Sequence, residues 1–529
     1  MIEIRIRLPL QYTDDDIRAQ ACALLPITRE EIRSCELLWR RLDTEDKPPR
    51  EYIARVALSL APEREAGLLK MRKRVSPYEK HTFSIPTVMP PARPPVVVGA
   101  GPAGLFCALI LAEAGLCPIL LERGLPVEER IRSVDAFHKT RLLDENSNIQ
   151  YGEGGAGTFS DGKLKLGKRD ADQWKVLSTF VELGAPQEIL YLDAPHLGTD
   201  RLVEIVKNMR RRLLSLGADI RFSHRLTDIS ITDGSLSGVL VEKDGEMLEI
   251  PTQTLFLAGG HSAHDLFAIL ECHGIRMEQR PFGIGVRIEH PQSLVNAWAY
   301  GENPPSDLPA ASYHFVTHLA SGRSVYSFCM CPGGSVVAAT SNQGRLVTNG
   351  MSESRRDGEL ANAAFLVSVF PSDFPTAHPL SGFTLQRQIE RDAFLAGGAD
   401  YSAPAIRMED FLYDRTPSAP HSIHPTYPLG TRPVSPSVYL PPHLVDSLRE
   451  AILEFDAWRP GFYCPDAMLT GAETRSTSPV RIVRGEDGVS PSLSGLYPVG
   501  EGAGYAGGIV SSAMDGIRCA MRYLSSLKK

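Results

Sequence analysis

The stretch PVVVGAGPAGLFCALILAEAGLCPILLERG, residues 95–124, decides the fold. Its first run, Val96 to Val98, predicts a short buried strand. Glycines follow at 99, 101 and 104, then a helical stretch and a second apolar run that ends on Glu122. A strand, glycine turn, helix, strand and acid in this order are typical of a dinucleotide-binding site.

Each position in this fingerprint has a physical reason. Gly99 permits a tight turn, Gly101 lets the backbone approach a pyrophosphate, and Gly104 lets the helix pack closely on the strand. The N-terminus of the helix then faces the phosphates. Glu122 is placed to accept hydrogen bonds from ribose hydroxyls. An incidental glycine turn is the competing interpretation, and the matching strand, helix and acid disfavour it.

A second glycine-rich turn lies near the end of the chain, in GLYPVGEGAGYAGGIVSSAMDGIRCAMRYL, residues 495–524. It predicts a strand over 496–499 and a helix that begins after Gly507-Gly508. FAD is long, and its flavin end needs such a second helix N-terminus, where N–H groups near Gly508 and Ile509 stabilise charge on the reduced ring. A helix that only packs on the sheet is the alternative.

Two segments between these turns predict the remaining strands of the nucleotide-binding sheet. Residues 199–231 predict an amphipathic helix followed by a strand, and residues 254–267 predict an apolar strand that runs into Gly259. In a doubly wound flavoprotein Gly259 passes close to the cofactor. A plain βαβ crossover is compatible with the same residues.

Composition narrows the class of protein. The chain has 529 residues, which predicts two or three domains, and a net charge of −7, which gives no global attraction to nucleic acid or anionic membranes. The start, MIEIRIRLPL, predicts a strand rather than a cleavable apolar segment. Nine scattered cysteines without a CxxC pair predict reduced thiols in the cytoplasm and no metal site.

The first 85 residues predict a small α/β domain, and the prolines of residues 86–94 predict a linker. Residues 28–43 fit either a helix with a Thr28/Glu31 capping box or a strand. The remaining elements predicted for this domain are a strand over 1–8, a helix capped by Thr13 and running to Leu25, a strand over 51–60 and a basic helix over 62–74.

Several motifs together resemble one known family, the bacterial FAD-dependent dehydrogenases often called NAD(FAD)-utilising dehydrogenases, within the glutathione-reductase-like flavoprotein superfamily. They are SNIQYGEGGAGTFSDGKL (147–164), PFGIGVRIEHPQ (281–292), YSFCMCPGGSVVAAT (326–340), TNGMS (348–352), ETRSTSPVRI (473–482) and YPVGEGAGYAGGIVSSAMDGI (497–517). The resemblance covers nearly the whole chain and implies no particular substrate.

The fold class implied is α/β. It comprises a Rossmann-like FAD-binding domain built from separated segments, an inserted mostly β domain over the flavin, and a small N-terminal α/β domain of ferredoxin-like type. The expected boundaries are 1–85 for the N-terminal domain, 95–280 and 466–529 for the FAD-binding domain, and 281–465 for the inserted domain.

This sequence departs from the family pattern at two places. His264 occupies a position where the family has arginine, and RSTSPVRI replaces RTSSPVRI.

The resemblance also explains GEGGAGTFSDGKL, residues 152–164. In this superfamily the chain after the second strand runs back along the cofactor, so we expect the loop to lie beside FAD. Its glycines expose N–H groups to phosphate and ribityl oxygens. Ser160 is expected to donate a hydrogen bond, and Lys163 to place a cation near the flavin or a bound anion. A flexible linker is the competing interpretation.

The predicted FAD-binding residues come from all of these segments. They are Gly99, Ala100, Gly101, Pro102, Ala103, Gly104, Glu122, Arg123, Gly155, Gly157, Ser160, Gly162, Lys163, Leu226, Gly259, Gly500, Glu501, Gly507, Gly508 and Ile509. Only one full dinucleotide fingerprint is present, and FAD occupies it. Any NAD(P)H that serves as electron donor therefore binds in a less recognisable way.

Catalytic residues are harder to identify, because the flavin itself carries the hydride or electron pair. Cys329 and Cys331 form a CxC on a predicted strand, where both share a face. A redox pair is one interpretation, but the short spacing strains a disulfide, and packing as small apolar residues is favoured. Lys163 is a further weak candidate for a role in the reaction.

Two other clusters offer polar side chains. Arg287, Glu289 and His290 are candidates to line a substrate pocket, although pairing of Arg287 with Glu289 along one strand face is favoured. Glu473, Arg475, Ser476 and Ser478 suit an anionic substrate, and a surface loop is nearly as good an interpretation.

The sequence thus predicts an FAD-dependent oxidoreductase, a dehydrogenase or reductase of a small polar molecule, with no membrane partner. Two alternatives remain open. One is a flavin-dependent RNA-modifying enzyme, for which the basic run at 70–74 is the only support near the N-terminal domain. The other is a flavin-binding protein without catalysis.

Overall fold

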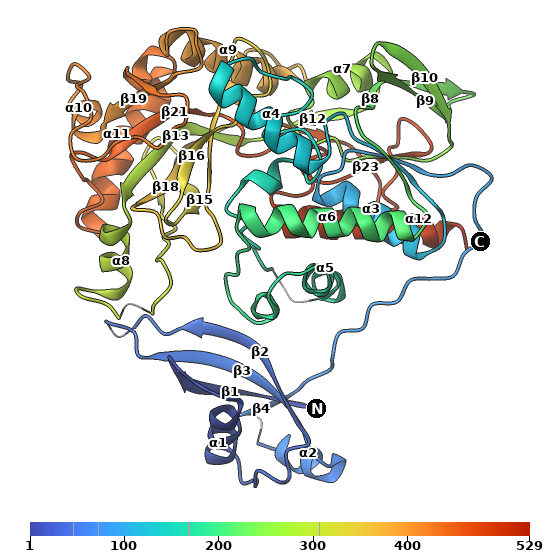
Figure 1. Ribbon diagram of the computed structural model, residues 1–529, viewed down its shortest axis with the longest axis vertical. Coiled ribbons are helices and arrows are strands. Elements are labelled where there is room, and N and C mark those ends of the chain that lie inside the picture. The colour runs from blue at the N-terminus through green and yellow to red at the C-terminus, as the bar shows by residue number, and fades with distance from the viewer. Residues whose placement is uncertain (46, 72–73, 168–169, 306, 529) are drawn as a thin grey trace.

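The computed structural model describes residues 1–45, 47–71, 74–167, 170–305 and 307–528. A small N-terminal unit lies at the lower end of the molecule in Figure 1, and a long connection joins it to the main body. The structure is mixed α/β with several sheets, in line with the expected class. The basic run at 70–74 includes residues 72 and 73, which lie outside the described residues.

The N-terminal unit has a four-stranded antiparallel sheet in the order β2-β3-β1-β4. Thr13 caps the first helix, as predicted, and forms a full capping box with Asp16. The ambiguous segment is a strand, and the helix predicted over 62–74 is wrong in length, because the chain turns after Leu68 to add an edge strand. The elements are β1 (Ile2–Pro9), α1 (Asp14–Leu24), β2 (Ser34–Leu42), β3 (Glu51–Ser59), α2 (Pro62–Leu68) and β4 (Val75–Pro77).

The N-terminal unit docks on the main body through its edge strand β2. The amide of Arg40 donates to the carbonyl of Tyr191 at 2.7 Å, and the amide of Asp193 donates to the carbonyl of Arg40 at 3.0 Å. Residues 86–94 contain no helix or strand, as their prolines predict, and this irregular segment extends over residues 78–95.

A five-stranded parallel sheet, ordered β23-β11-β5-β6-β7, gathers segments that lie far apart in sequence. Helix α3 (Pro102–Glu113) is almost wholly buried, and α12 (Ile509–Ser526) packs against it. The two helices can approach closely because Gly516 has no side chain. A Cβ at this position would clash with the carbonyl of Ala103. The strands are β5 (Val96–Val98), β6 (Ile119–Leu121), β7 (Asp219–Arg221), β11 (Leu255–Leu257) and β23 (Leu496–Pro498).

Further elements surround this sheet. Helix α6 crosses the front of the molecule, with α5 below it (Figure 1). A three-stranded antiparallel sheet, β10-β9-β8, and a two-stranded sheet, β12-β22, complete this half. The elements are α4 (Val127–Thr140), α5 (Ala171–Glu182), α6 (Thr199–Ser215), β8 (Arg225–Thr232), β9 (Ser235–Lys243), β10 (Glu246–Pro251), α7 (His264–Cys272), β12 (Met277–Gln279) and β22 (Val480–Ile482).

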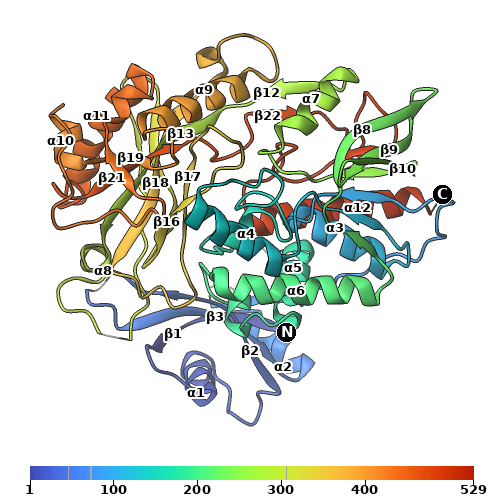
Figure 2. The ribbon, with the colours of Figure 1, turned by 45° about the horizontal axis from the view of Figure 1, so that its top comes forward.

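The other half is built on a seven-stranded sheet, ordered β14-β15-β18-β13-β21-β19-β20, with a two-stranded sheet, β16-β17, beside it (Figure 2). Strand β21 lies inside this sheet, between β13 and β19, although it begins after residue 465, where the boundary of the inserted domain was expected. The elements are β13 (Phe282–Pro291), α8 (Gln292–Tyr300), β14 (Val316–His318), β15 (Ser324–Cys331), β16 (Ser335–Ala338), β17 (Thr348–Met351), β18 (Leu360–Val369), α9 (Ser381–Ala396), β19 (Ala403–Arg407), α10 (Met408–Leu412), β20 (Thr431–Pro433), α11 (Pro442–Trp458) and β21 (Met468–Glu473).

Candidate functional site

One cavity is lined both by the carboxyl ends of the parallel strands and by strands β15, β17 and β21 of the large sheet. Most of the predicted cofactor residues line it. They are Gly99, Gly101, Pro102, Ala103, Glu122, Arg123, Gly155, Gly157, Ser160, Gly162, Lys163, Leu226, Gly259, Glu501, Gly507, Gly508 and Ile509. Ala100, Gly104 and Gly500 do not line the cavity; they shape the turns behind it.

The first glycine turn has the geometry that the fingerprint predicts. Gly99 has a φ of +100°, which favours glycine, and a Cβ at Gly104 would clash with the Gly99 carbonyl. At Gly101, by contrast, a Cβ would have only the Gly155 Cα within 4 Å, at 3.9 Å. The backbone at Gly101 therefore stands open toward the cavity.

Glu122 connects the turn to the glycine loop. One carboxylate oxygen accepts from the amide of Ala100 at 2.8 Å, and the other accepts from the amides of Gly124 at 2.9 Å and Gly152 at 3.0 Å. The side chain is buried and lines the cavity. Three backbone donors thus fix its position, and lone-pair capacity remains for one further donor.

Arg130 was not identified from the sequence, yet it organises the glycine loop. It is fully buried and donates to five backbone carbonyls, those of Asn148, Ile149, Gly152, Glu153 and Gly155. Burial lowers the pKa of its guanidinium to about 9. No local pattern could reveal this role, because the carbonyls come together only when the loop folds back on α4.

The glycine loop packs between the two helix N-termini. A Cβ at Gly155, where φ is +61°, would lie 3.0 Å from the Gly101 Cα, and one at Gly157 would lie 3.2 Å from Cγ1 of Ile509. The loop is therefore part of the cavity wall, not a flexible linker. Ser160 lines the cavity as expected, and its hydroxyl donates to the Gly157 carbonyl at 2.6 Å within the loop. A hydrogen bond from Ser160 to FAD stays a prediction.

Both helices present their N-termini to the cavity without a side-chain cap. At Gly507 a Cβ would have no atom within 4 Å, and at Gly508 only the Ser511 hydroxyl, at 4.0 Å. Behind them, Asp515 accepts from the amide of Gly500 at 2.7 Å and holds the second turn. Uncapped helix N-termini are suited to bind anionic groups.

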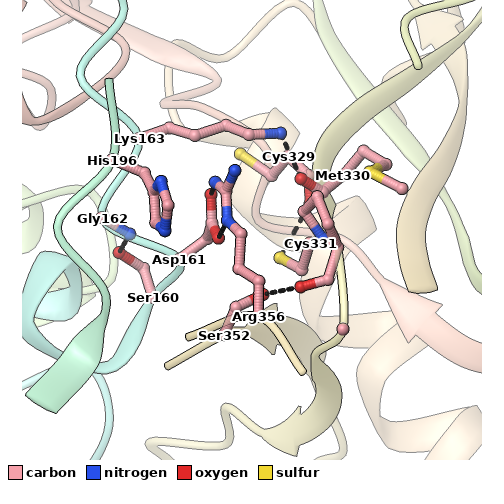
Figure 3. Close-up of polar contacts among 12 residues, drawn as sticks. Ser160, Asp161, Gly162, Lys163, His196, Cys329, Met330, Cys331, Ser352 and Arg356 are labelled. Carbon is pink, nitrogen blue, oxygen red and sulfur yellow. Dashed lines mark hydrogen bonds and ion pairs between the residues drawn. The ribbon is translucent and has the colours of Figure 1, made fainter. Parts of the chain in front are cut away.

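The end of the glycine loop faces strand β15 (Figure 3). The ammonium of Lys163 donates to the carbonyl of Met330, and burial lowers its pKa. Beside it, Asp161 accepts from two guanidinium nitrogens of Arg356, at 2.6 and 3.1 Å. Lys163 therefore reaches the cavity wall as expected, but its ammonium is already bound to a backbone carbonyl.

Cys329 and Cys331 both line the cavity as free thiols. The strand is irregular here: Cys329 has a φ of +41°, and the pairing register shifts between Phe328 and Cys331. The expected sharing of one face by strand alternation therefore does not hold. Cys331 donates its S–H to the Cys329 carbonyl at 3.2 Å, and burial raises its pKa to about 12 and also raises that of Cys329. Protonated buried thiols are unreactive.

The expected pairing of Arg287 with Glu289 is wrong. Arg287 donates to Asn362 at 2.6 Å and lies 3.4 Å from Glu473, whereas Glu289 accepts from the Thr426 hydroxyl at 2.6 Å. Arg287 and Glu289 thus each find a partner on a neighbouring segment, and they do not pair with each other along β13. Arg287, Glu289 and His290 are buried in the sheet and do not line the cavity.

The segment at 473–478 is buried, so the surface-loop interpretation is wrong. Arg475 lines the cavity but forms a two-point ion pair with Glu390, both contacts at 2.9 Å. Ser476 bonds to the backbone of Gly283, and Ser478 to that of Val480. Both hydroxyls are therefore used in hydrogen bonds to the backbone, although Ser476 also lines the cavity.

His261, which the sequence did not predict, lines the cavity and pairs with the predicted residue Glu501. His261 lies with Nδ1 3.5 Å from a carboxylate oxygen of Glu501, and its buried Nε2 has no partner in the described part of the chain. His264, the departure from the family pattern, packs against Phe383 with ring centroids 4.4 Å apart and ring planes tilted by 45°, and it does not line the cavity.

The cavity fits FAD. Two uncapped helix N-termini face it, as a pyrophosphate and a flavin ring require, and the glycines at 101, 507 and 508 leave their Cβ positions open. Within the described residues no group of three metal-binding side chains comes together, and no helix is both long and apolar enough to cross a membrane.

Comparison with known proteins supports the cofactor. Residues 281–476 match the family described as FAD-dependent protein, C-terminal domain-like. An uncharacterized protein of Clostridium beijerinckii is 40% identical over 517 residues, which is 96% of this chain and 96% of that protein. The cofactor of this chain is FAD.

Two solved structures illustrate the range of structural matches. A geranylgeranyl bacteriochlorophyll reductase-like protein of Thermoplasma acidophilum has a TM-score of 0.36 at 11% identity, covering 82% of this chain and 78% of that one. The E. coli quinol fumarate reductase FrdA has a TM-score of 0.37 at 12% identity, covering 83% and 70%.

Proposed function

We propose, from the premise that this chain belongs to the same family as the Clostridium beijerinckii protein and uses FAD, that it is a dehydrogenase or reductase of a small polar molecule. The finer placement among the NAD(FAD)-utilising dehydrogenases, with a Rossmann-like FAD domain, is part of this proposal. It rests on the sequence motifs together with the parallel sheet and glycine turns described above.

One observation carries the proposal. A single cavity has the two helix N-termini on one side and the polar wall of β15, β17 and β21 on the other. When bound, FAD supplies transfer of a hydride or electron pair. The chain would bind its pyrophosphate at the N-terminus of α3, hold the ribose beside Glu122, and present the amides near Gly508 and Ile509 to the flavin.

The experiment is an anaerobic reduction screen of the purified yellow protein. NADH, NADPH and a panel of hydroxy acids, amino acids and small alcohols are added singly, and bleaching of the flavin absorbance is followed. Reduction by at least one of these donors supports the proposal. Failure of all of them, with the flavin still reducible by dithionite, refutes it in favour of a flavin-binding protein without this catalysis.

A second candidate, a flavin-dependent RNA-modifying enzyme, is favoured by a cavity between the N-terminal sheet and residues 170–193, which Arg5, Trp39 and Arg55 line. Arg5 and Arg55 are directly opposed across β1 and β3, and the guanidinium of Arg55 lies 5.4 Å from the ring of Trp39. Aromatic and cationic side chains together suit nucleotides. Filter binding with bulk tRNA distinguishes this candidate, because RNA contact predicts a steep loss of affinity with salt.

The proposed location is the cytoplasm. All nine cysteines are free thiols in the structure, including the exposed Cys117 and Cys272, which suits a reducing compartment. Fractionation followed by immunodetection tests it.

A further inference from the structure

Four carboxyl groups line the cavity in the described part of the chain, and one of them differs from the rest. Glu122 is held by three backbone amides, Asp161 by an arginine, and Glu501 is 29% exposed. The Glu473 side chain is only 3% exposed, and its Oε2 is buried without a hydrogen-bond partner. A buried acceptor without a partner is costly, so a ligand that donates a hydrogen bond there would satisfy it.

The ion pair of Glu473 with Arg287 leaves this oxygen free. Oε1 lies 3.4 Å from Arg287 Nη1, a long contact. The other nitrogens of Arg287 donate to the side chain of Asn362 at 2.6 and 3.2 Å and to the carbonyl of Cys329 at 3.0 Å. The guanidinium is therefore shared among several acceptors, and the carboxyl of Glu473 is not tied down at both oxygens.

The groups that face Glu473 come from three strands. Arg287 lies on β13, Cys329 on β15, and Thr348 on β17, where its hydroxyl faces Glu473 and favours the ionised carboxylate. On the α9 side, Glu390 is neutralised by Arg475. Burial raises the pKa of Glu473 to about 7, against the lowering effect of Arg287. Both protonation states are therefore accessible near neutral pH, as a general acid–base requires.

We infer that Glu473 is the proton-transfer group of the flavin reaction and that the substrate carries an O–H or N–H on the carbon that yields the hydride. This rests on the proposed function. As the C–H bond breaks, its hydride passes to FAD, and the proton of the O–H or N–H passes to the free oxygen of Glu473. The product has a C=O or C=N bond. In the reverse direction Glu473 returns the proton while FAD supplies the hydride.

Glu473→Gln tests this inference, because it keeps the shape and an acceptor for Arg287 but cannot take a proton. The matched control is Glu289→Gln, since Glu289 is a buried carboxyl on the neighbouring strand outside the cavity. With a donor from the screen, flavin reduction is expected to slow by about 100-fold or more in Glu473→Gln and to stay unchanged in Glu289→Gln. The wild-type rate should rise with pH through about 7, and the rate of Glu473→Gln should not.

A measurement without substrate separates this inference from the proposed function. Burial raises the pKa of both Glu473 and Glu153 to about 7, so infrared difference spectra of the FAD-loaded protein across pH should show carboxyl titration near 7 from both. The Glu473 part should be lost in Glu473→Gln and kept in Glu289→Gln, and the Glu153 part should remain in both variants. If no donor reduces the wild-type flavin, the proposed function fails, and this titration still decides whether Glu473 is poised to transfer protons. Titration at the ordinary value of about 4, or reduction by Glu473→Gln within about threefold of wild type, overturns the inference.

Discussion

Replacing Arg130 with methionine should destabilise the glycine loop more than an ordinary substitution. Its side chain is fully buried, and four of the five carbonyls that it binds lie at 2.7–2.9 Å, those of Asn148, Ile149, Glu153 and Gly155. At about 1 kcal/mol for each carbonyl left without a donor, the loss approaches about 4 kcal/mol. Because the same loop walls the cavity, FAD affinity should fall by at least about tenfold, equal to about 1.4 kcal/mol.

Urea unfolding gives the stability change, and FAD titration of the apoprotein gives the affinity. The control is Arg276→Met, an arginine that is 66% exposed and paired with Glu278, which should change stability by less than about 0.5 kcal/mol. If Arg130→Met unfolds within about 1 kcal/mol of wild type and binds FAD normally, the loop does not depend on this side chain, and the reasoning is refuted.

Three further variants test the cavity wall. Glu122→Ala leaves three amides without their acceptor and should lower stability by about 2–3 kcal/mol and weaken FAD binding by about 10–100-fold, measured by unfolding and titration; wild-type values for both would remove Glu122 from the site. Replacing Cys329 and Cys331 by alanine together should leave flavin reduction within about threefold and cost about 1–3 kcal/mol of stability; lost reduction with bound flavin would make them a redox pair. Lys163→Met should retain FAD but lower its midpoint potential by on the order of 30 mV, because a cation near the reduced flavin is lost; an unchanged potential would show that the lysine acts only on Met330.

The elements that the sequence predicts well are set by local pattern. The turn at Gly99, the strand before it and the helix after it follow from residues within one short segment, and the structure has them. The same holds for the helix that begins after Gly508 and for the capped helix after Thr13. In each case the residue that permits the turn or caps the helix lies directly beside that turn or helix in the sequence.

Long-range partners could not be predicted in this way. Arg287 meets Glu473 across 186 residues, and nothing in the local pattern of GVRIEHP distinguishes that partner from Glu289. The bulge at Cys329 likewise could not be predicted, because a regular strand places side chains alternately on its two faces and this bulge interrupts that alternation. Arg130 reads as an ordinary charged residue on an amphipathic helix until the loop encloses it.

The most direct test of the FAD site is the FAD content of Gly101→Val. Gly101 has a φ of −77° and open space at its Cβ, so valine should fold without strain while filling the place where the pyrophosphate approaches. Gly67→Val, in a helix of the N-terminal unit with no atom near its Cβ, is the control. The account predicts stoichiometric FAD in wild type and Gly67→Val, and none in a folded Gly101→Val. Stoichiometric FAD in Gly101→Val would contradict it.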